Sequence, residues 1–374
     1  MNKLTGTFIF ILLSFCTLGS NFKADSISSL LNSTTDPRTT ANLKIELAWI
    51  KKYEDLKLST KTTLENLKQL NQLNDDEGVA IATSYLGVYY YLDNKLPEAV
   101  IQLKIAEEYF EREQNVDRLC RVYNNLGVCY GSLYNYIEAL SYYNKVLDLK
   151  NQLPQVHDIS SNLINIASIY YNQGDYNQCI NYYEQALVLT IANKNHESTA
   201  IVYSNLGASY ERLGNYPESI NYALKALEVY QNKTENKLAI IRTYSNLGST
   251  YMSLNKLEEA RHYYNRSSEL NKEANSEGQQ IVILNNLAEL ERLSGNYKQA
   301  KTHALKGLSL SIATNNSEEE LISLNTLSNI ENDLQDYKSS LWYYKEYIQL
   351  SDSLLEISNY QKTQLALDQN QLIT

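Results

Sequence analysis

Hydrophobic and polar positions follow one pattern that recurs along most of this chain. A Leu and a small residue are followed by a Tyr three residues after the small one, as in "YNNLGVCY" around Gly127 and "YSNLGASY" around Gly207. Residues three apart share one face of an α-helix, so the spacing predicts a helix in each copy. The small residue recurs in steps of 40 or 41 residues, in seven copies: Gly87, Gly127, Ala167, Gly207, Gly248, Ala288 and Ser328.

A second small residue follows the first by twelve positions in every copy. Between the two lies a turn in which Gly174, Gly214 and Gly295 share one place, where the end of a helix favours a left-handed residue. Pro97 and Pro217 fall just after this turn, where we expect the first position of a new helix. Each copy is therefore predicted to be helix, turn, helix, with small side chains where the two helices cross. The second set is Ala99, Ala139, Cys179, Ser219, Ala260, Ala300 and Ser340.

Composition agrees with this organisation. The chain of 374 residues has only 4 prolines, which favours long uninterrupted helices. It also has 32 tyrosines, many at fixed places in each copy, such as Tyr130, Tyr170 and Tyr210 three residues after the small one. An aromatic stripe at helical spacing that recurs in every copy is typical of a core, so we interpret these tyrosines as packing residues.

The order of small residue, Tyr, turn Gly, Asp/Asn-Tyr and Ala resembles the tetratricopeptide repeat (TPR), in the longer variant of about 40 residues found in kinesin light chains and bacterial sensor and regulatory proteins. The resemblance covers residues 79–350 and implies an all-α fold, an α-α superhelix (TPR solenoid) of seven clear repeats. Residues 40–78 fit the same frame as a degenerate N-terminal repeat, with Leu47 in place of the small residue. Residues 351–374 are predicted to form a C-terminal helix that caps the array or, alternatively, continues as a solvent helix.

The N-terminus has the layout of a secretory signal peptide over residues 1–20. Lys3 precedes the apolar run "FIFILLSFCTL", which ends at Gly19 and Ser20. Residues 21–39 would then be a linker, and no other apolar run is long enough to span a membrane. We therefore expect an exported protein, periplasmic or secreted. In the alternative interpretation, Cys16 carries a lipid and the protein is an envelope lipoprotein.

Charge and motif content argue against several functions. The net charge of −10 and the absence of a Lys/Arg cluster disfavour nucleic acid as a partner. The four histidines are far apart, and no phosphate-binding loop or serine nucleophile motif is present. We therefore predict no catalytic residue, no metal, no cofactor and no enzyme activity. Cys120, Cys129 and Cys179 form no disulfide framework and are interpreted as small hydrophobic residues.

The resemblance also implies a concave groove lined by the first helix of every repeat. Two residues before the small one, five successive repeats carry asparagine: Asn125, Asn165, Asn205, Asn246 and Asn286. In peptide-binding members of the family, an asparagine at the matching place hydrogen-bonds the main chain of the ligand, and an amide offers both a donor and an acceptor. The other groove candidates are Arg121, Arg212, Arg242, Arg292 and Tyr171. Alternatively, the asparagines bridge adjacent first helices and stiffen the stack.

These observations lead to two hypotheses of function. The first is an exported, non-enzymatic TPR scaffold that binds a protein or peptide segment in its groove. The second is a sensory or regulatory module of a bacterial signalling system, related to TPR-containing histidine kinases or transcription regulators, either stand-alone or truncated.

Overall fold

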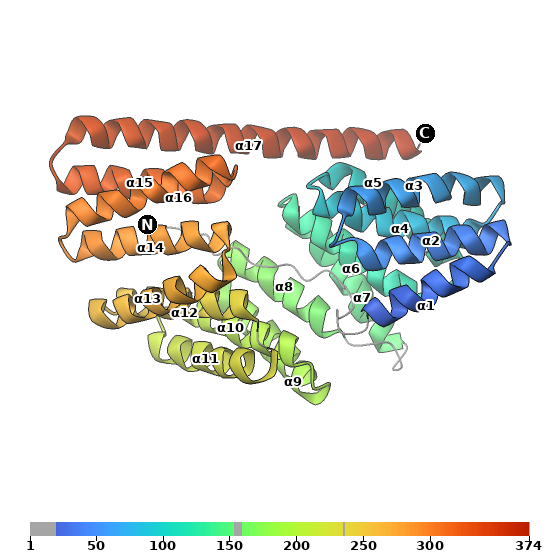
Figure 1. Ribbon diagram of the computed structural model, residues 1–374, viewed down its shortest axis with the longest axis horizontal. Coiled ribbons are helices and arrows are strands. Elements are labelled where there is room, and N and C mark those ends of the chain that lie inside the picture. The colour runs from blue at the N-terminus through green and yellow to red at the C-terminus, as the bar shows by residue number, and fades with distance from the viewer. Residues whose placement is uncertain (1–19, 153–158, 235, 374) are drawn as a thin grey trace. The chain divides into compact units, whose positions relative to one another are not determined.

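The computed structural model describes residues 20–152, 159–234 and 236–373 (Figure 1). Side-chain environments are described for residues 23–150, 159–234 and 236–357. The predicted signal peptide, including Cys16, lies outside these residues except for Ser20. The described residues form helices joined by short turns: α1 (Ser20–Ser33), α2 (Pro37–Lys51), α3 (Leu56–Gln72), α4 (Asp76–Leu92), α5 (Leu96–Arg112), α6 (Val116–Ser132), α7 (Tyr136–Gln152), α8 (Ser160–Gln173), α9 (Tyr176–Ala192), α10 (His196–Arg212), α11 (Tyr216–Val229) with the π-helical turn η2 (Tyr230–Thr234), α12 (Lys237–Ser253), α13 (Leu257–Ala274), α14 (Glu277–Leu293), α15 (Tyr297–Ala313), α16 (Ser317–Asp333) and α17 (Tyr337–Ile373).

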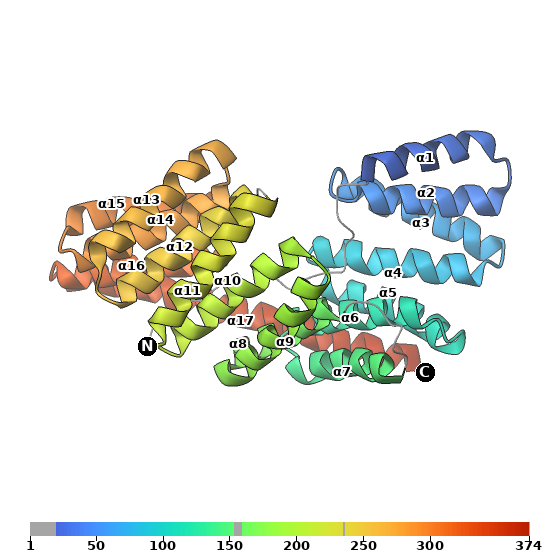
Figure 2. The ribbon, with the colours of Figure 1, turned by 90° about the horizontal axis from the view of Figure 1, so that it is seen from below.

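The chain divides into two compact units, with the boundary inside α8. The N-terminal unit has its main part before residue 170, and the C-terminal unit holds residues 170–357. Each is a stack of helix pairs, and Figure 2 shows the successive helices of the C-terminal unit side by side. None of the described helices combines the length and the apolar composition that crossing a bilayer requires.

The seven predicted repeats are present as the helix pairs α4–α5, α6–α7, α8–α9, α10–α11, α12–α13, α14–α15 and α16–α17. Small residues stand where the helices of a pair cross. A Cβ atom added to Gly87 would lie 2.5 Å from Cγ of Leu103, and one added to Gly248 would lie 2.4 Å from the ring of Tyr264. Such distances are far below van der Waals contact, so the small residues are needed for the close approach of the helices.

Most of the repeated tyrosines pack as predicted, but Tyr337 and Tyr344 of the last repeat are 65% and 48% exposed. In four repeats, the Tyr that follows the small residue stacks on a Tyr of the second helix, with the planes nearly parallel; in the fourth repeat, Tyr210 and Tyr222 have ring centroids 5.4 Å apart at 5°. Tyr143, Tyr183 and Tyr264 are fully buried. The excess of tyrosine is therefore explained by packing at equivalent places in successive repeats.

The turns inside the repeats also agree with the sequence. Gly174, Gly214 and Gly295 have φ of 82°, 76° and 77°, the left-handed values that a helix end favours. The two prolines are one place later than predicted: Pro97 and Pro217 are the second residues of α5 and α11, because each helix begins at the preceding residue.

Residues 21–39 differ from the predicted linker. Ser20–Ser33 form α1, which contacts α2 and buries Ala24, while α2 already begins at Pro37. The side chain of Asp36 caps α2 by accepting a hydrogen bond from the backbone N–H of Thr39. This segment has mostly polar residues and no repeat pattern, so its sequence gave little indication of a helix.

The N-terminal repeat has its small residue one position later than we expected. Ala48, not Leu47, is the twelfth residue of α2, the place that Gly87 has in α4, and Ala48 is buried. Ser59 is buried at the fourth residue of α3, where Ala99 stands in α5. The two small residues are thus present in α2–α3 as Ala48 and Ser59, but they are one residue closer together than in the seven clear repeats.

Of the two alternatives for residues 351–374, the continuing helix is observed and a separate capping helix is not. Helix α17 runs without a break from Tyr337 to Ile373, so the second helix of the last repeat and the predicted cap are one element. The sequence at the expected boundary, "QLSDSLLE", contains neither Gly nor Pro to end a helix.

Candidate functional site

All ten predicted groove residues lie on first helices of the repeats, which we call the first-helix wall of each unit. Arg121 and Asn125 belong to α6, and Asn165 and Tyr171 to α8. The rest are on α10 (Asn205, Arg212), α12 (Arg242, Asn246) and α14 (Asn286, Arg292). Arg121, Asn125 and Asn165 fall in the N-terminal unit and the other seven in the C-terminal unit, so the two walls are described separately.

In the N-terminal unit, the two predicted groove asparagines, Asn125 and Asn165, are buried. Asn165 is fully buried, and its Nδ2 donates a hydrogen bond of 3.1 Å to Oδ1 of Asn124 on α6. Asn125 is also buried, and its Oδ1 accepts no hydrogen bond from the described residues. Asn165 therefore bridges the adjacent first helices α6 and α8, which was the alternative to a contact with a ligand.

In the C-terminal unit, Asn205, Asn246 and Asn286 are half-buried on three successive first helices. The Nδ2 atom of Asn205 is out of contact with solvent and has no hydrogen-bond acceptor among the described residues. Buried donors are normally paired, so an unpaired amide on this wall is unusual.

Between α14 and α16 the bridge is made by Asn285, the residue before Asn286. Asn285 donates from Nδ2 to Oε2 of Glu319 at 2.9 Å, and its Oδ1 accepts from Ser323 Oγ at 2.7 Å. These bonds join α14 to α16. Asn286, the predicted ligand residue, stands next to this bridge but is not the residue that makes it.

Two arginines of this wall, Arg212 and Arg292, are engaged with other wall residues. Arg212 Nε donates to the hydroxyl of Tyr171 at 2.9 Å, which joins α10 to α8. Arg292 makes two bonds of 2.8 Å to Glu289 and one of 2.6 Å to Asp333 on α16. The charge of Arg292 is thus neutralised by two carboxylates, whereas Arg212 is held by a neutral hydroxyl. Arg121 and Arg242 are half-buried.

Glu211 is a wall residue that the sequence analysis missed. Its Oε1 accepts a hydrogen bond of 2.8 Å from Ser249 Oγ, across from α10 to α12. Burial raises the pKa of the Glu211 carboxyl, against the opposing effect of this bond. No repeated residue type marks this position, so one sequence gave no signal for it.

A common spacing connects several of these contacts. Asn165–Asn124, Arg212–Tyr171 and Arg292–Asp333 each join residues 41 apart, one more than the usual repeat length. In these three pairs, a wall residue bonds the residue of the neighbouring repeat that is offset by one position from its own equivalent. Other contacts between first helices, Ser249–Glu211 and Ser323–Asn285, join residues 38 apart, so the spacing alone does not identify the pairs.

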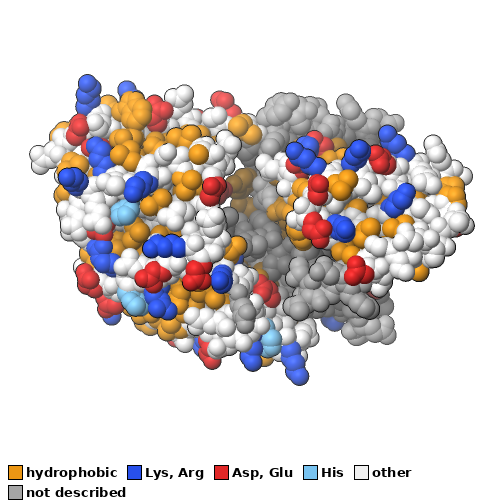
Figure 3. Space-filling model, in the orientation of Figure 1, with side chains coloured by type: hydrophobic (Ala, Val, Ile, Leu, Met, Phe, Trp, Pro, Cys, Tyr) orange, Lys and Arg blue, Asp and Glu red, His pale blue; other side chains and the backbone are white. Residues whose placement is uncertain are grey.

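The described side chains of the two walls offer hydrogen-bonding groups rather than a metal site or a nucleophilic thiol. Among them, no group of three His, Cys, Asp or Glu residues is placed to hold a metal ion. Cys129 and Cys179 are buried and Cys120 is half-buried; burial raises the pKa of Cys179 to about 12. Such a thiol is a packing group rather than a nucleophile at neutral pH. On the face shown in Figure 3, Lys and Arg are interspersed with Asp and Glu in each unit.

Comparisons with known proteins agree with this architecture. Models of the tetratricopeptide repeat match residues 121–153 and, in overlapping segments, residues 158–311, which together are half of the chain. A comparison with functionally characterised protein sequences gave no significant match.

Solved structures with a similar fold include three bacterial proteins. The apo quorum sensor NprR from B. thuringiensis has a TM-score of 0.70 and 19% identity over 88% of this chain and 93% of its own. A Rap protein in complex with Competence and Sporulation Factor has 0.64 and 15% over 91% and 96%. Aspartyl phosphate phosphatase F from Bacillus subtilis has 0.62 and 13% over 90% and 89%. At these identities the likeness shows the fold, and with the matched repeats it establishes that the chain belongs to the tetratricopeptide repeat family.

Proposed function

We propose that this protein is a non-enzymatic scaffold that binds an extended protein or peptide segment on the first-helix wall of its C-terminal unit. The observation that carries the proposal is the unpaired Nδ2 of Asn205, which has asparagines at the same place on the next two first helices. Arg292 is paired with Glu289 and Asp333 and Arg212 is bonded to Tyr171, so we expect the ligand to be held by amides and hydroxyls more than by one charged group.

A peptide main chain suits such a wall for a physical reason. A buried donor without an acceptor costs about 1–3 kcal/mol. Because Nδ2 of Asn205 is out of contact with solvent, the half-buried side chain would rotate to present it to a carbonyl group of a bound segment, which would remove this cost. Asn246 and Asn286 would offer the same groups at the spacing of the helices. Side chains of the segment would be recognised only where they reach the wall, so we expect a sequence preference at a few positions.

Similar folds support a second candidate, a sensory module that changes its interactions when a peptide binds. The quorum sensor NprR and a Rap protein bound to Competence and Sporulation Factor both resemble the chain over most of its length. A peptide signal on the C-terminal wall is compatible with both candidates, which differ in whether the peptide is the cargo or the signal.

Export is the further part of the proposal, and it rests on the sequence of residues 1–20 alone. We propose that the signal peptide is removed after Gly19 or Ser20. Mass spectrometry of the N-terminus of protein purified from the native cell envelope tests this directly. A mature chain beginning at residue 20 or 21 supports periplasmic or secreted location, a chain lipidated at Cys16 supports the lipoprotein, and an intact Met1 contradicts export.

The binding proposal is tested by selecting peptides from a displayed random library with the purified protein and measuring their affinity by fluorescence anisotropy. We expect Asn205→Ala and Asn246→Ala each to weaken binding about tenfold, since each removes a hydrogen bond to the ligand. Asn265→Ala is the matched control, because Asn265 is an exposed asparagine on the second helix of the repeat that contains Asn246. Equal affinities for all three variants would contradict a binding role for this wall.

A further inference from the structure

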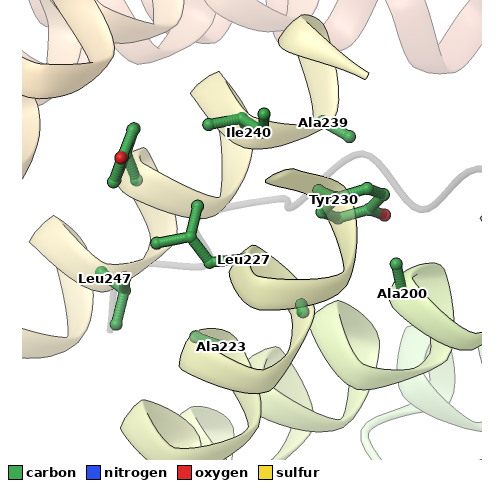
Figure 4. Packing of buried hydrophobic residues seen from close by; sticks show 9 residues of the cluster. Ala200, Ala223, Leu227, Tyr230, Ala239, Ile240 and Leu247 are labelled. Atoms are coloured by element: carbon green, nitrogen blue, oxygen red, sulfur yellow. The ribbon is translucent and has the colours of Figure 1, made fainter. Parts of the chain in front are cut away.

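Two positions recur at the junctions between successive repeats of the C-terminal unit. One lies on the second helix, thirteen residues after the small residue, and the other on the following first helix, three residues after its small residue. Between the fourth and fifth repeats these residues are Ile220 and Tyr251, which both pack against a buried apolar cluster. Figure 4 shows this cluster, which contains Leu227 of α11 and Leu247 of α12. This junction is therefore apolar.

The next two junctions have buried ion pairs at the same positions. Arg261 of α13 pairs with Glu291 of α14, which is 1% exposed, and Lys301 of α15 pairs with Glu331 of α16, which is 2% exposed. The carboxylate of Glu291 also accepts a hydrogen bond of 2.7 Å from Asn296 Nδ2. Neutralising one partner of a buried pair leaves the other charge uncompensated, so these junctions depend on both partners staying charged.

His303 adds a second titratable group to the first of these charged junctions. In the second to fifth repeats, a Tyr three residues after the small residue stacks on a Tyr fifteen residues after it. The sixth repeat has Glu291 and His303 at those two positions. Nδ1 of His303 is out of contact with solvent and has no hydrogen-bond partner among the described residues. Protonation of the ring would place a charge and a further N–H donor in this site, and both would need a partner.

Other charged groups near Glu291 and His303 come from the helices on either side of α14. They are Arg261 and Glu258 of α13 and Lys306 of α15. From α12, Tyr251 packs against the apolar part of this junction and carries no charge at neutral pH. From α16, Glu331 is already in the ion pair of the next junction. A proton on His303 would therefore face two cations, while the carboxylate that could balance it, Glu291, is already paired.

We propose that the junction between the fifth and sixth repeats is an acid-sensitive joint, at which the last two repeats lose their packing against α13 when His303 and then Glu291 take up protons. The joint lies between the wall residues Asn246 of α12 and Asn286 of α14, so its opening separates them.

Both protonation steps weaken the fold in acid. Burial lowers the pKa of His303, against the opposing effect of Glu291, so the unfolded chain takes up this proton first and stability falls as the pH drops below about 6.5. Although burial opposes it, the hydrogen bond from Arg261 holds the pKa of Glu291 below its ordinary value. The stability that this pair provides is therefore fully present above about pH 4.3 and is lost as the pH falls through the folded-state pKa.

Hydrogen exchange of the full chain, followed by mass spectrometry at pH 7.5, 5.5 and 4, tests the joint. Exchange rates are corrected for the intrinsic effect of pH, so that protection reports local opening. Between pH 7.5 and pH 4, we expect protection in α14–α16 to fall at least about tenfold more than protection in α10–α12.

Two variants and a control assign the effect to this junction. R261I/E291Y gives the junction the residues of the preceding one and should abolish the difference between the two segments. H303Y should abolish only the part that develops between pH 7.5 and pH 5.5. K237Q/E273Q is the control, because it removes an exposed ion pair of 3.1 Å between α12 and α13 and should keep the wild-type profile.

Three results would overturn the proposal: a wild-type chain without loss of protection in acid, an equal loss in both segments, or a wild-type profile in R261I/E291Y. Circular dichroism checks that each variant keeps its helix content. If the double variant does not fold, H303Y decides, and an unchanged loss between pH 7.5 and pH 5.5 in H303Y overturns the proposal.

Discussion

Gly127 and Tyr143 are matched in size: a Cβ atom added to the glycine would lie 2.4 Å from Cε1 of the tyrosine ring. The tyrosine is fully buried, so its ring cannot move toward solvent without opening the core. The same relationship recurs between Gly248 and Tyr264 in the C-terminal unit.

Gly127→Ala should therefore be destabilising even though alanine is the better helix former. We expect a loss of about 1–3 kcal/mol in the free energy of unfolding, because the added methyl overpacks the helix crossing. Urea unfolding followed by circular dichroism measures it. Gly278→Ala is the control: a Cβ atom there meets nothing within 4 Å, so that variant should be neutral or slightly more stable. Equal effects of the two substitutions would contradict the size match.

The hydroxyl groups of Tyr143 and Tyr264 are buried without a hydrogen-bond partner among the described residues. Tyr143→Phe should consequently leave stability unchanged or raise it by about 1 kcal/mol, since an unsatisfied polar group is removed. Tyr85→Phe should have the opposite effect and cost about 1 kcal/mol, because the Tyr85 hydroxyl donates to Oε1 of Glu46 at 2.8 Å. The same unfolding experiment compares them. A loss of stability in Tyr143→Phe as large as in Tyr85→Phe would show that the buried hydroxyl has a partner.

Glu211 gives a prediction of pH dependence. Burial raises the pKa of its carboxyl, so the folded state holds the proton more tightly than the unfolded state. Its ionisation therefore destabilises the fold fully above the folded-state pKa, and not at all below the unfolded value of about 4.3. Glu211→Gln keeps an acceptor for Ser249 and should raise Tm at pH 7, with the gain disappearing near pH 4.

Thermal unfolding at a series of pH values tests this prediction. Glu259→Gln is the matched control, because Glu259 is exposed in the same unit. A gain in Tm for Glu211→Gln that stays constant between pH 4 and pH 7 would mean that the effect is not the ionisation of this carboxyl.

The asparagines of the first helices should separate into two classes by stability. Asn165→Ala removes a buried bond to Asn124 and should cost about 1–3 kcal/mol. Asn246→Ala changes a half-buried residue and should cost less than about 0.5 kcal/mol. Chemical denaturation of the two variants distinguishes a bridging asparagine from one that is available to a ligand. Similar costs would indicate that Asn246 is also a structural residue.

Much of the fold could be predicted because the crossing of two helices demands a small residue at a fixed place. Gly127 and Gly248 satisfy that demand, and their recurrence revealed the repeats without a structure. Helix α1 escaped prediction because, among its side chains from Lys23 to Ser33, only Ala24 is buried, so this part of the helix needs no apolar stripe. Ala48 was missed because the first repeat is shorter by one residue between its two small positions, which shifts the frame that the other repeats define.

The candidate site was predictable in position but not in detail. The sequence placed Asn165 and Arg292 on first helices, which the structure bears out. It could not show that Asn165 is used within the stack, or that Arg292 is neutralised by Glu289 and Asp333, because those partners depend on how adjacent helices are offset. The 41-residue spacing of such contacts is visible only once the stack is known.

The central claim is that an extended segment binds the C-terminal first-helix wall, and a photo-crosslink tests it most directly. A benzoylphenylalanine is introduced at Ala208, a half-buried wall position on α10 three residues from Asn205, and in a second sample at the exposed Asn265 on α13. A selected peptide is added and the samples are irradiated. We predict that the peptide crosslinks at position 208 and not at position 265, whereas crosslinking at 265 alone, or equally at both, would contradict the claim.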